Sequence, residues 1–150
     1  MKKLIGLLLI LPLVGAEPAG YKYWSAADLK GMAKPLSNKT DAKTSLENLG
    51  DFGVDRAVTV HREGSGLAEL HETEADLMVI VSGKGELIVG GTMRDGKTTA
   101  AGEVRGPSID GGMHQKLSPG DIIHVPPKTP HQVLLDPGAQ ITYFVLKVKE

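Results

Sequence analysis

The sequence predicts an all-β barrel or sandwich with a short helical extension at its N-terminus. From residue 54 onward, short apolar or alternating runs recur about every ten residues, with glycine, proline or aspartate between them. No long helical pattern separates these runs, which is typical of antiparallel sheets. The chain is therefore expected to divide into a signal peptide (1–16), an N-terminal extension (17–52) and a barrel (53–150).

The first residues have the pattern of a secretory signal peptide. Two lysines precede an apolar run from Leu4 to Val14, and the small pair Gly15-Ala16 follows. These eleven residues are too few to cross a bilayer, which takes about 20, so no stable membrane association is expected after cleavage. We therefore expect an exported protein, either periplasmic or extracellular.

A short helix is predicted in the extension over Ser25–Ala33. Ser25 suits an N-cap, Asp28 follows it three residues later, and Pro35 is expected to end the segment. The stretch "TSLENLG" at 44–50 is interpreted as one more helical turn.

Seven runs in the barrel are predicted strands: "VDRAVTVHR", "GLAELHE", "DLMVIVS", "GELIVGG", "DIIHVPP", "HQVLLD" and "QITYFVLKV". The glycine-rich stretch 90–118 is expected to be a long excursion with one or two edge strands around "GEVRG" and "MHQKL".

The composition limits the classes of function. The 150 residues carry 17 basic and 18 acidic side chains and no cysteine, which suits one globular domain. This balance gives no reason to expect nucleic acid as a partner. The absence of cysteine excludes disulfides, thiolate metal sites and cysteine nucleophiles.

The stretch "GGTMRDGKTT" contains the phosphate-loop pattern GxxxxGK[ST]. A phosphate loop leads from a strand of a parallel sheet into a helix, but Gly102, Gly106 and Pro107 leave no room for a helix here. We predict a tight turn at Asp95-Gly96, with Lys97 and Thr98 as solvated turn residues, and no bound nucleotide.

Two other stretches resemble the motifs of the cupin superfamily, in particular its small single-domain members. "ELHETEADLMVIVSGKG" is similar to the first motif, with His71, Asp76 and Gly83 at matching positions. "GDIIHVPPKTPH" is similar to the second motif, with Gly120, Pro126 and His131 at matching positions. Glu69 replaces the first histidine of the family pattern, Lys128 a glycine and Leu135 an asparagine, and Asp76 is shorter than the usual glutamate.

This resemblance implies a jelly-roll barrel whose mouth holds a divalent metal, namely Zn, Fe, Mn or Ni. The implied ligands are Glu69, His71, Asp76 and His131, with Glu74 as a substitute. Residues two apart in a strand share a face, so Glu69 and His71 are expected to point the same way. Isomerase, decarboxylase and dioxygenase chemistry all occur in the family, and the sequence does not choose among them.

Three interpretations of the function stay open. The first is a metal-binding cupin acting on a small polar or acidic molecule. The second is a non-enzymatic module that uses the same mouth to hold a sugar-like or small organic ligand without redox chemistry. The third is a structural cupin whose site has decayed, with His71 and His131 as polar lining of the barrel mouth. A homodimer is expected in each case.

Further residues could contact a ligand. Arg62 is a candidate for holding an anion, as is Arg105. His124 is a weaker ligand candidate, since it lies inside a predicted strand. His61 and His114 are expected to be exposed on loops or edges.

Overall fold

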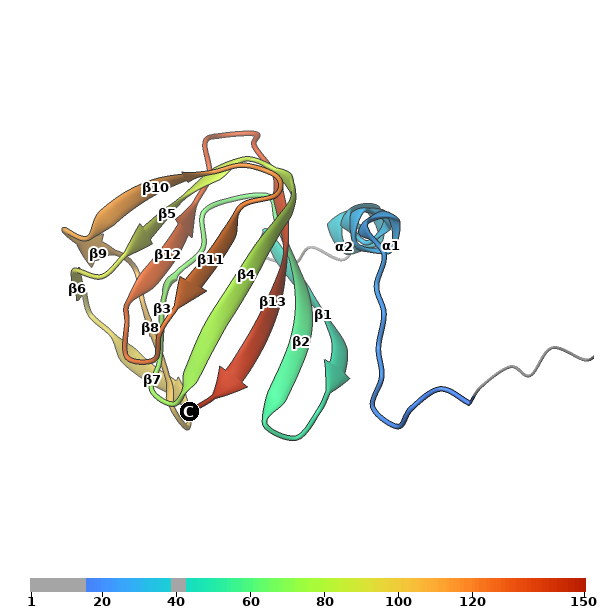
Figure 1. Cartoon of the computed structure of the whole chain (residues 1–150). Coiled ribbons are helices and arrows are strands. Elements are labelled where there is room, and N and C mark those ends of the chain that lie inside the picture. Colours follow the sequence, from blue (N-terminus) through green and yellow to red (C-terminus); the bar gives the residue numbers. More distant parts are fainter. Residues whose placement is uncertain (1–15, 39–42) are drawn as a thin grey trace, which may run out of the picture.

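The computed structural model describes residues 16–38 and 43–150, and two sheets face each other in it (Figure 1). The five-stranded sheet has the order β1 (Thr44–Asp51), β2 (Asp55–Arg62), β13 (Ile141–Lys149), β4 (Glu74–Gly83), β11 (Ile122–Val125). The six-stranded sheet has the order β10 (Met113–Leu117), β5 (Gly85–Val89), β12 (His131–Leu134), β3 (Ala68–His71), β8 (Glu103–Gly106), β7 (Lys97–Ala100). A small third sheet pairs β6 (Thr92–Met93) with β9 (Ile109–Asp110).

Successive strands alternate between the two large sheets. The chain passes from one sheet to the other between β2 and β3, β3 and β4, and β4 and β5, and does so again from β11 to β13. All strand pairs are antiparallel. This crossing pattern makes a jelly-roll barrel, so the predicted all-β fold class is confirmed.

The core lies between the two sheets because each strand turns alternate side chains inward. In β13, Ile141, Tyr143 and Val145 face the interior and expose 1%, 4% and 3% of their surface. The same cluster takes in apolar residues of β2, β4, β5, β11 and β12, together with Leu117 at the end of β10. A fully buried side chain such as Leu87 contributes about 1.5–3 kcal/mol to folding.

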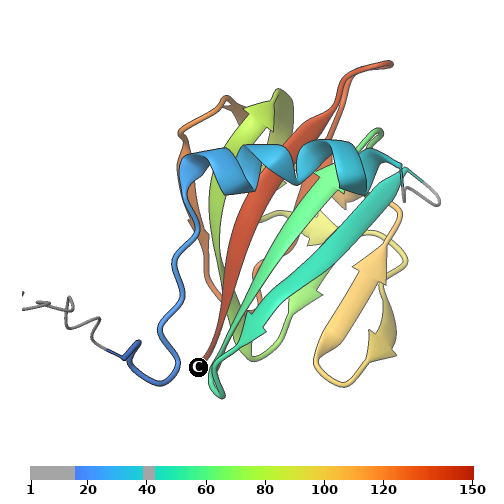
Figure 2. The same cartoon turned by 90° about the vertical axis from the view of Figure 1, so that its right-hand side faces the viewer.

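Two short helices cover the outer face of the five-stranded sheet, as Figure 2 shows. The first, α1 (Ala26–Gly31), begins with the expected capping box, in which the Ser25 and Asp28 side chains each accept from the other's backbone N–H. The second, α2 (Ala33–Ser37), runs across Pro35, so the expectation that Pro35 ends the helical segment is wrong. Pro35 lies in the first turn of α2, where no backbone N–H is needed for a helical hydrogen bond.

The helical turn expected at 44–50 is also wrong, because these residues form most of β1. This strand pairs with β2 from Thr44↔Arg62 to Asp51↔Arg56. Its register shifts between Asn48 and Gly50, so it lacks the strict alternation that would mark a strand in the sequence. The five-stranded sheet therefore begins at Thr44, inside the segment expected to be an extension.

His61 is buried, which contradicts the expectation of an exposed residue. The imidazole exposes 2% of its surface and lies on the outer face of β2, beneath the helices. Its Nδ1 lies 2.8 Å from Thr142 Oγ1, and its Nε2 lies 3.3 Å from Glu63 Oε1. Because the helices cover this face, both faces of β2 are buried. The residues of this strand therefore do not alternate between a buried and an exposed face.

The excursion at 90–118 contains the two predicted strands, as β8 and β10. β8 is an interior strand, however, because β7 (Lys97–Ala100) pairs with its free side. Lys97 and Thr98 thus belong to a strand rather than a turn, and this strand stands where a phosphate loop would need a helix. The turn before it contains Asp95 with φ of +43°.

Among the described residues, no helix is long and apolar enough to span a bilayer. The predicted signal peptide falls almost wholly outside the described residues, which start at Ala16.

Candidate metal centre and cavity

Strands of both sheets bring charged side chains together in the barrel interior. Glu69 and His71 lie two residues apart on β3, and His131 of β12 pairs in register with Glu69. Asp76 of β4 and Lys147 of β13 pair in register in the opposite sheet. The cluster therefore spans the space between the sheets.

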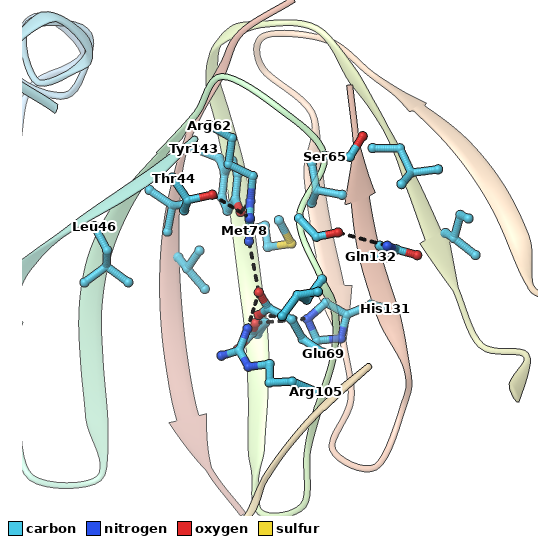
Figure 3. Close-up of a pocket in the computed structure, with 18 of the residues that line it drawn as sticks. Thr44, Leu46, Arg62, Ser65, Glu69, Met78, Arg105, His131, Gln132 and Tyr143 are labelled. Atoms are coloured by element: carbon cyan, nitrogen blue, oxygen red, sulfur yellow. Dashed lines mark hydrogen bonds and ion pairs between the residues drawn. The ribbon is translucent and has the colours of Figure 1, made fainter. Parts of the chain in front are cut away.

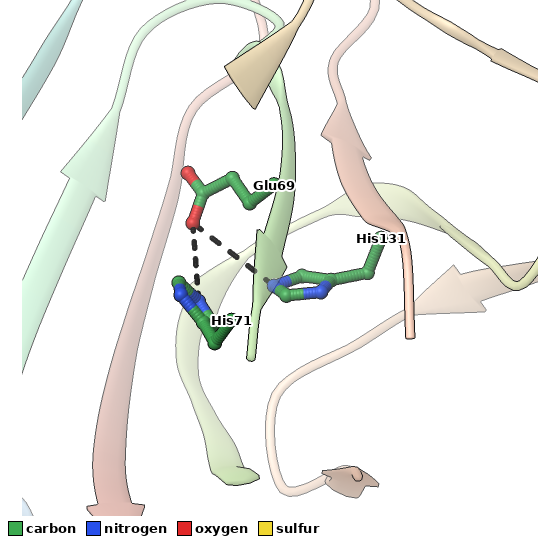
Figure 4. Close-up of side chains that lie close together, drawn as sticks. All are labelled: Glu69, His71 and His131. Atoms are coloured by element: carbon green, nitrogen blue, oxygen red, sulfur yellow. Dashed lines mark ion pairs between the residues drawn. The ribbon is translucent and has the colours of Figure 1, made fainter. Parts of the chain in front are cut away.

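Glu69, His71 and His131 form a group that could hold a metal ion (Figure 4). One ligand atom from each lies within 4.8 Å of the others. Glu69 Oε2 is 3.8 Å from His71 Nε2 and 4.0 Å from His131 Nε2. Two ligand atoms that each bind one ion at about 2.0–2.2 Å lie only slightly closer to each other than these atoms do. Small movements of the side chains therefore suffice to enclose a metal. The prediction that Glu69 and His71 share a face is confirmed.

Both imidazoles are fixed through their Nδ1 atoms. His71 Nδ1 lies 2.7 Å from Glu103 Oε1, and His131 Nδ1 lies 3.1 Å from the backbone oxygen of Thr129. An Nδ1–H that donates to an acceptor leaves the Nε2 lone pair of a neutral imidazole free to bind a metal. Such outer hydrogen bonds are usual for metal-binding histidines. Both Nε2 atoms face the same cluster.

Asp76 also approaches both imidazoles despite its short side chain. Its Oδ2 lies 3.3 Å from His71 Nε2 and 3.6 Å from His131 Nε2. Burial alone would raise the pKa of Asp76, but hydrogen bonds from His131 and His71 and the charge of Lys147 hold it well below its usual range. Asp76 is therefore ionised, and it faces the group formed by Glu69, His71 and His131.

Lys147 is a residue of the cluster that the sequence analysis missed, and Glu103 is another. Lys147 Nζ lies 2.9 Å from His71 Nε2 and 2.7 Å from Asp76 Oδ1. The signal in the sequence was the alternation of "ITYFVLK", which places Lys147 on the same face as buried Ile141 and Tyr143. An inward-facing lysine at the end of an apolar strand needs an acidic partner, and Asp76 supplies it.

His71 has a different hydrogen bond in each protonation state. Burial and the charge of Lys147 lower the pKa of His71, whereas Asp76 and Glu103 raise it. The carboxylates have the larger effect, so the pKa of His71 lies above its usual value. The protonated ring donates from Nε2 toward Asp76. In the neutral ring, Nε2 accepts from Lys147.

Two arginines orient Glu69 by binding its other carboxylate oxygen. Arg62 Nη2 lies 2.9 Å from Glu69 Oε1, and Arg105 Nη1 contacts the same oxygen. Burial raises the pKa of Glu69, but the charges of Arg105 and Arg62 outweigh it and lower the pKa. Glu69 thus stays ionised, with Oε2 turned toward the imidazoles.

Each of the three guanidinium nitrogens of Arg62 already donates to a protein group. Its Nε donates to Tyr143 Oη at 2.7 Å and its Nη1 to Thr44 Oγ1 at 3.1 Å. Arg62 was expected to hold an anionic ligand, and it does line the cavity, but its guanidinium mainly orients Glu69. Arg105 also lines the cavity and is 31% exposed, so it is the more accessible of the two arginines.

A cavity of about 1030 Å³ opens beside the charged cluster (Figure 3). Glu69, Asp76, His131 and Lys147 line its polar end. Apolar side chains of both sheets line the remainder, including Val58, Val60, Met78, Ile88, Val133 and Val145. Ligand sites in proteins have this form, with a mainly apolar wall and a few polar groups gathered at one place.

The other candidate residues lie apart from the group of three. Glu74 Oε2 is 4.0 Å from Lys147 Nζ and 3.6 Å from Arg56 Nη2. His124 is exposed on a face of β11 and does not line the cavity. His114 is exposed on the edge strand β10, as expected, and contacts Glu86.

Comparison with known proteins identifies similar folds but no similar sequence. No family model matches the chain, and no curated protein matches it. An uncharacterized conserved protein with a double-stranded β-helix domain from Klebsiella pneumoniae is similar in structure, with a TM-score of 0.58 and 14% identity over 86% of this chain and 90% of that one.

Two further structures resemble the chain. A cupin 2 conserved barrel domain protein from Rhodopseudomonas palustris has a TM-score of 0.51 and 18% identity, over 71% of this chain and 63% of that one. The DMSP lyase DddQ from Ruegeria pomeroyi has a TM-score of 0.53 and 16% identity, over 72% of this chain and 48% of that one. The chain thus spans less than two thirds of the length of either protein.

Proposed function

The chain has the cupin fold, and we propose that it holds a divalent metal on Glu69, His71 and His131 and binds a small polar or acidic molecule beside it. The observation that carries this proposal is the convergence of three ligand atoms within 4.8 Å at the end of a cavity. The Nδ1 contacts of both imidazoles support it, because they orient each Nε2 toward the same point.

The donor set restricts the metal to a few ions. Two imidazoles and one or two carboxylates suit Zn, Fe, Mn or Ni. A bound ion of this kind supplies Lewis acidity, or an oxygen-binding centre in the case of iron. Arg105 lines the cavity with a partly exposed guanidinium and favours a ligand that carries an acidic group. The apolar wall favours a ligand with a hydrocarbon part.

A metal-free binding module is the second candidate function. One observation favours it: the Lys147 ammonium already lies against His71 and Asp76 as a cation would. In that case the same cavity would bind a sugar-like or organic molecule through hydrogen bonds and apolar contact alone.

Metal titration of tag-free protein separates the two functions. Calorimetry with Zn²⁺ and Mn²⁺ after removal of bound metal should give one site per chain for at least one ion. His71→Ala and His131→Ala should abolish this site, whereas His124→Ala should keep it because His124 lies outside the cluster. Equal binding by all four proteins would refute the metal site, and absence of binding in each would favour the metal-free module.

We also propose export and dimerisation. The pattern of residues 1–16 supports export, and cleavage after Ala16 would be seen as a mature N-terminus at Glu17. Exposed Ile122 on β11, at the edge of the five-stranded sheet, supports pairing between copies. Sedimentation analysis of the mature protein tests the dimer.

A further inference from the structure

Lys147 occupies the side of the cluster where a metal would bind. Its Nζ lies 2.9 Å from His71 Nε2, the atom whose lone pair the proposed metal needs, and 2.7 Å from Asp76 Oδ1. A divalent ion bound to His71 would stand within van der Waals distance of the ammonium group. The two cations cannot share this space, since their repulsion in a buried site is large.

The charge balance of the cluster also indicates that a bound metal would displace a cation of the protein. Three carboxylates surround the imidazoles, those of Glu69, Asp76 and Glu103. Three cations contact these carboxylates, namely Arg62, Arg105 and Lys147. With neutral imidazoles the cluster is thus balanced, so an added divalent ion creates excess positive charge unless a cation leaves.

Lys147 is the cation that can leave. Arg62 is held by Tyr143, Thr44 and Glu69 together. Arg105 contacts Glu69 and Glu103 and does not lie against an imidazole nitrogen. Lys147 Nζ lies against His71 Nε2 and has a second acidic partner beyond the cluster. Glu74 lies two residues before Asp76 on β4, with its Oε2 4.0 Å from Nζ. A rotation of the flexible lysine stem would exchange Asp76 for Glu74, and it would free both His71 Nε2 and Asp76.

We infer that Lys147 is a tethered cation that competes with the metal for His71 and Asp76. Metal binding requires the ammonium to turn toward Glu74, and Asp76 then becomes available as a fourth ligand. Displacement of Lys147 costs free energy, and this cost makes metal binding less favourable. The wild-type protein therefore holds its metal weakly and exchangeably. This inference rests on the proposed metal site.

Measured metal affinities test this competition directly. Lys147→Met keeps the length of the stem and removes the ammonium, so it should lower the Kd for Zn²⁺ or Mn²⁺ by about tenfold or more. Lys147→Gln is a second neutral variant with a polar end, and it should act in the same direction. Lys149→Met is the matched control, because this lysine is exposed on the same strand.

Glu74→Gln tests the position to which Lys147 withdraws. Loss of this partner should raise the Kd for metal, the opposite of the Lys147 variants. Circular dichroism verifies that each variant folds.

The outcomes separate this inference from the proposed function. Tighter binding in both neutral Lys147 variants, and not in Lys149→Met, supports the competition, as does metal binding seen only when Lys147 is replaced. If His71→Ala and His131→Ala abolish binding but the Lys147 variants bind like Lys149→Met, the metal site stands and the competition is refuted. If no variant binds metal, the proposed metal site itself fails.

Discussion

Lys147 and Asp76 lie opposite each other in register on β13 and β4, and Lys147 Nζ donates to Asp76 Oδ1 over 2.7 Å. Their side chains expose only 11% and 6% of their surface. The two charges therefore compensate each other inside the barrel, beside both imidazoles and at the lining of the cavity. Removal of either charge leaves the other in a poorly solvated place.

The first prediction is that Asp76→Asn destabilises the metal-free protein. Asparagine keeps the shape but removes the charge, so the Lys147 ammonium loses its nearest acidic partner and retains only Glu74, whose Oε2 lies 4.0 Å from Nζ. Loss of one member of a buried ion pair costs about 3–5 kcal/mol when no other partner remains, and Glu74 reduces this cost. Urea unfolding of EDTA-treated protein measures this loss. The matched control is Asp110→Asn, which removes the exposed partner of Arg94 and should change the unfolding free energy little. Equal effects of the two substitutions would contradict the prediction.

The second prediction concerns the acid limb of stability. The folded-state pKa values of Asp76 and Glu69 are lowered, so the unfolded chain binds protons more readily at these groups. Their stabilisation is fully present above the unfolded pKa values of about 4 and is lost as pH falls through the lower folded values. The unfolding free energy of metal-free protein should therefore decrease below about pH 5.

This acid limb should be shallower in Asp76→Asn, since the variant lacks one of the two groups. Unfolding by urea at a series of pH values, with wild type and variant side by side, measures the two slopes. An identical slope in both proteins would show that Asp76 titrates normally in the folded state.

The sequence predicted the parts of the site that local spacing encodes. His71 and His131 stand in patterned stretches, and Glu69 follows from the two-residue period of a strand. Lys147 escaped because its role depends on the register between β13 and β4, which the sequence does not display. Glu103 lies in a glycine-rich stretch whose pairing with β3 is set by the fold.

The contrast between local pattern and tertiary contacts also explains the two wrong predictions about the fold. β1 pairs with β2 through a register shift that removes its alternation, so its local pattern resembles a helical turn. The local sequence predicts an exposed His61, but two helices cover the face of the sheet on which His61 lies. In both places tertiary contacts decided the structure, and local preference did not.

The third prediction is that Gly83→Ala destabilises the protein more than Gly138→Ala. Gly83 ends β4 with φ of +82°, and an added Cβ would lie 2.0 Å from the backbone oxygen of Gln140. Gly138 has a similar φ of +79°, but no atom lies within 4 Å of an added Cβ. The conformational cost, about 1–2 kcal/mol, is shared by both, so the difference isolates the steric clash.

Thermal or urea unfolding of the two glycine variants measures this difference. Gly83→Ala should lose at least about 1 kcal/mol more than Gly138→Ala, because the contact is with backbone that cannot move without shifting β13. If the two variants lose the same stability, the turn after β4 is more adaptable than its geometry indicates.

The fourth prediction is that Glu103→Gln weakens metal binding although Glu103 is not a proposed ligand. Its carboxylate accepts from His71 Nδ1 over 2.7 Å and thereby raises the basicity of Nε2. His131 has a backbone oxygen in the same role, so Glu103 is the one of these two acceptors that a substitution can neutralise. Loss of such an outer contact lowers metal affinity by about 10-fold to 100-fold.

Calorimetric titration with Zn²⁺ measures this loss of affinity. Glu86→Gln is the control, because Glu86 contacts exposed His114 at the edge of the sheet. If both variants bind Zn²⁺ as the wild type does, Glu103 holds the ring without tuning it, and the orientation of His71 depends on packing alone.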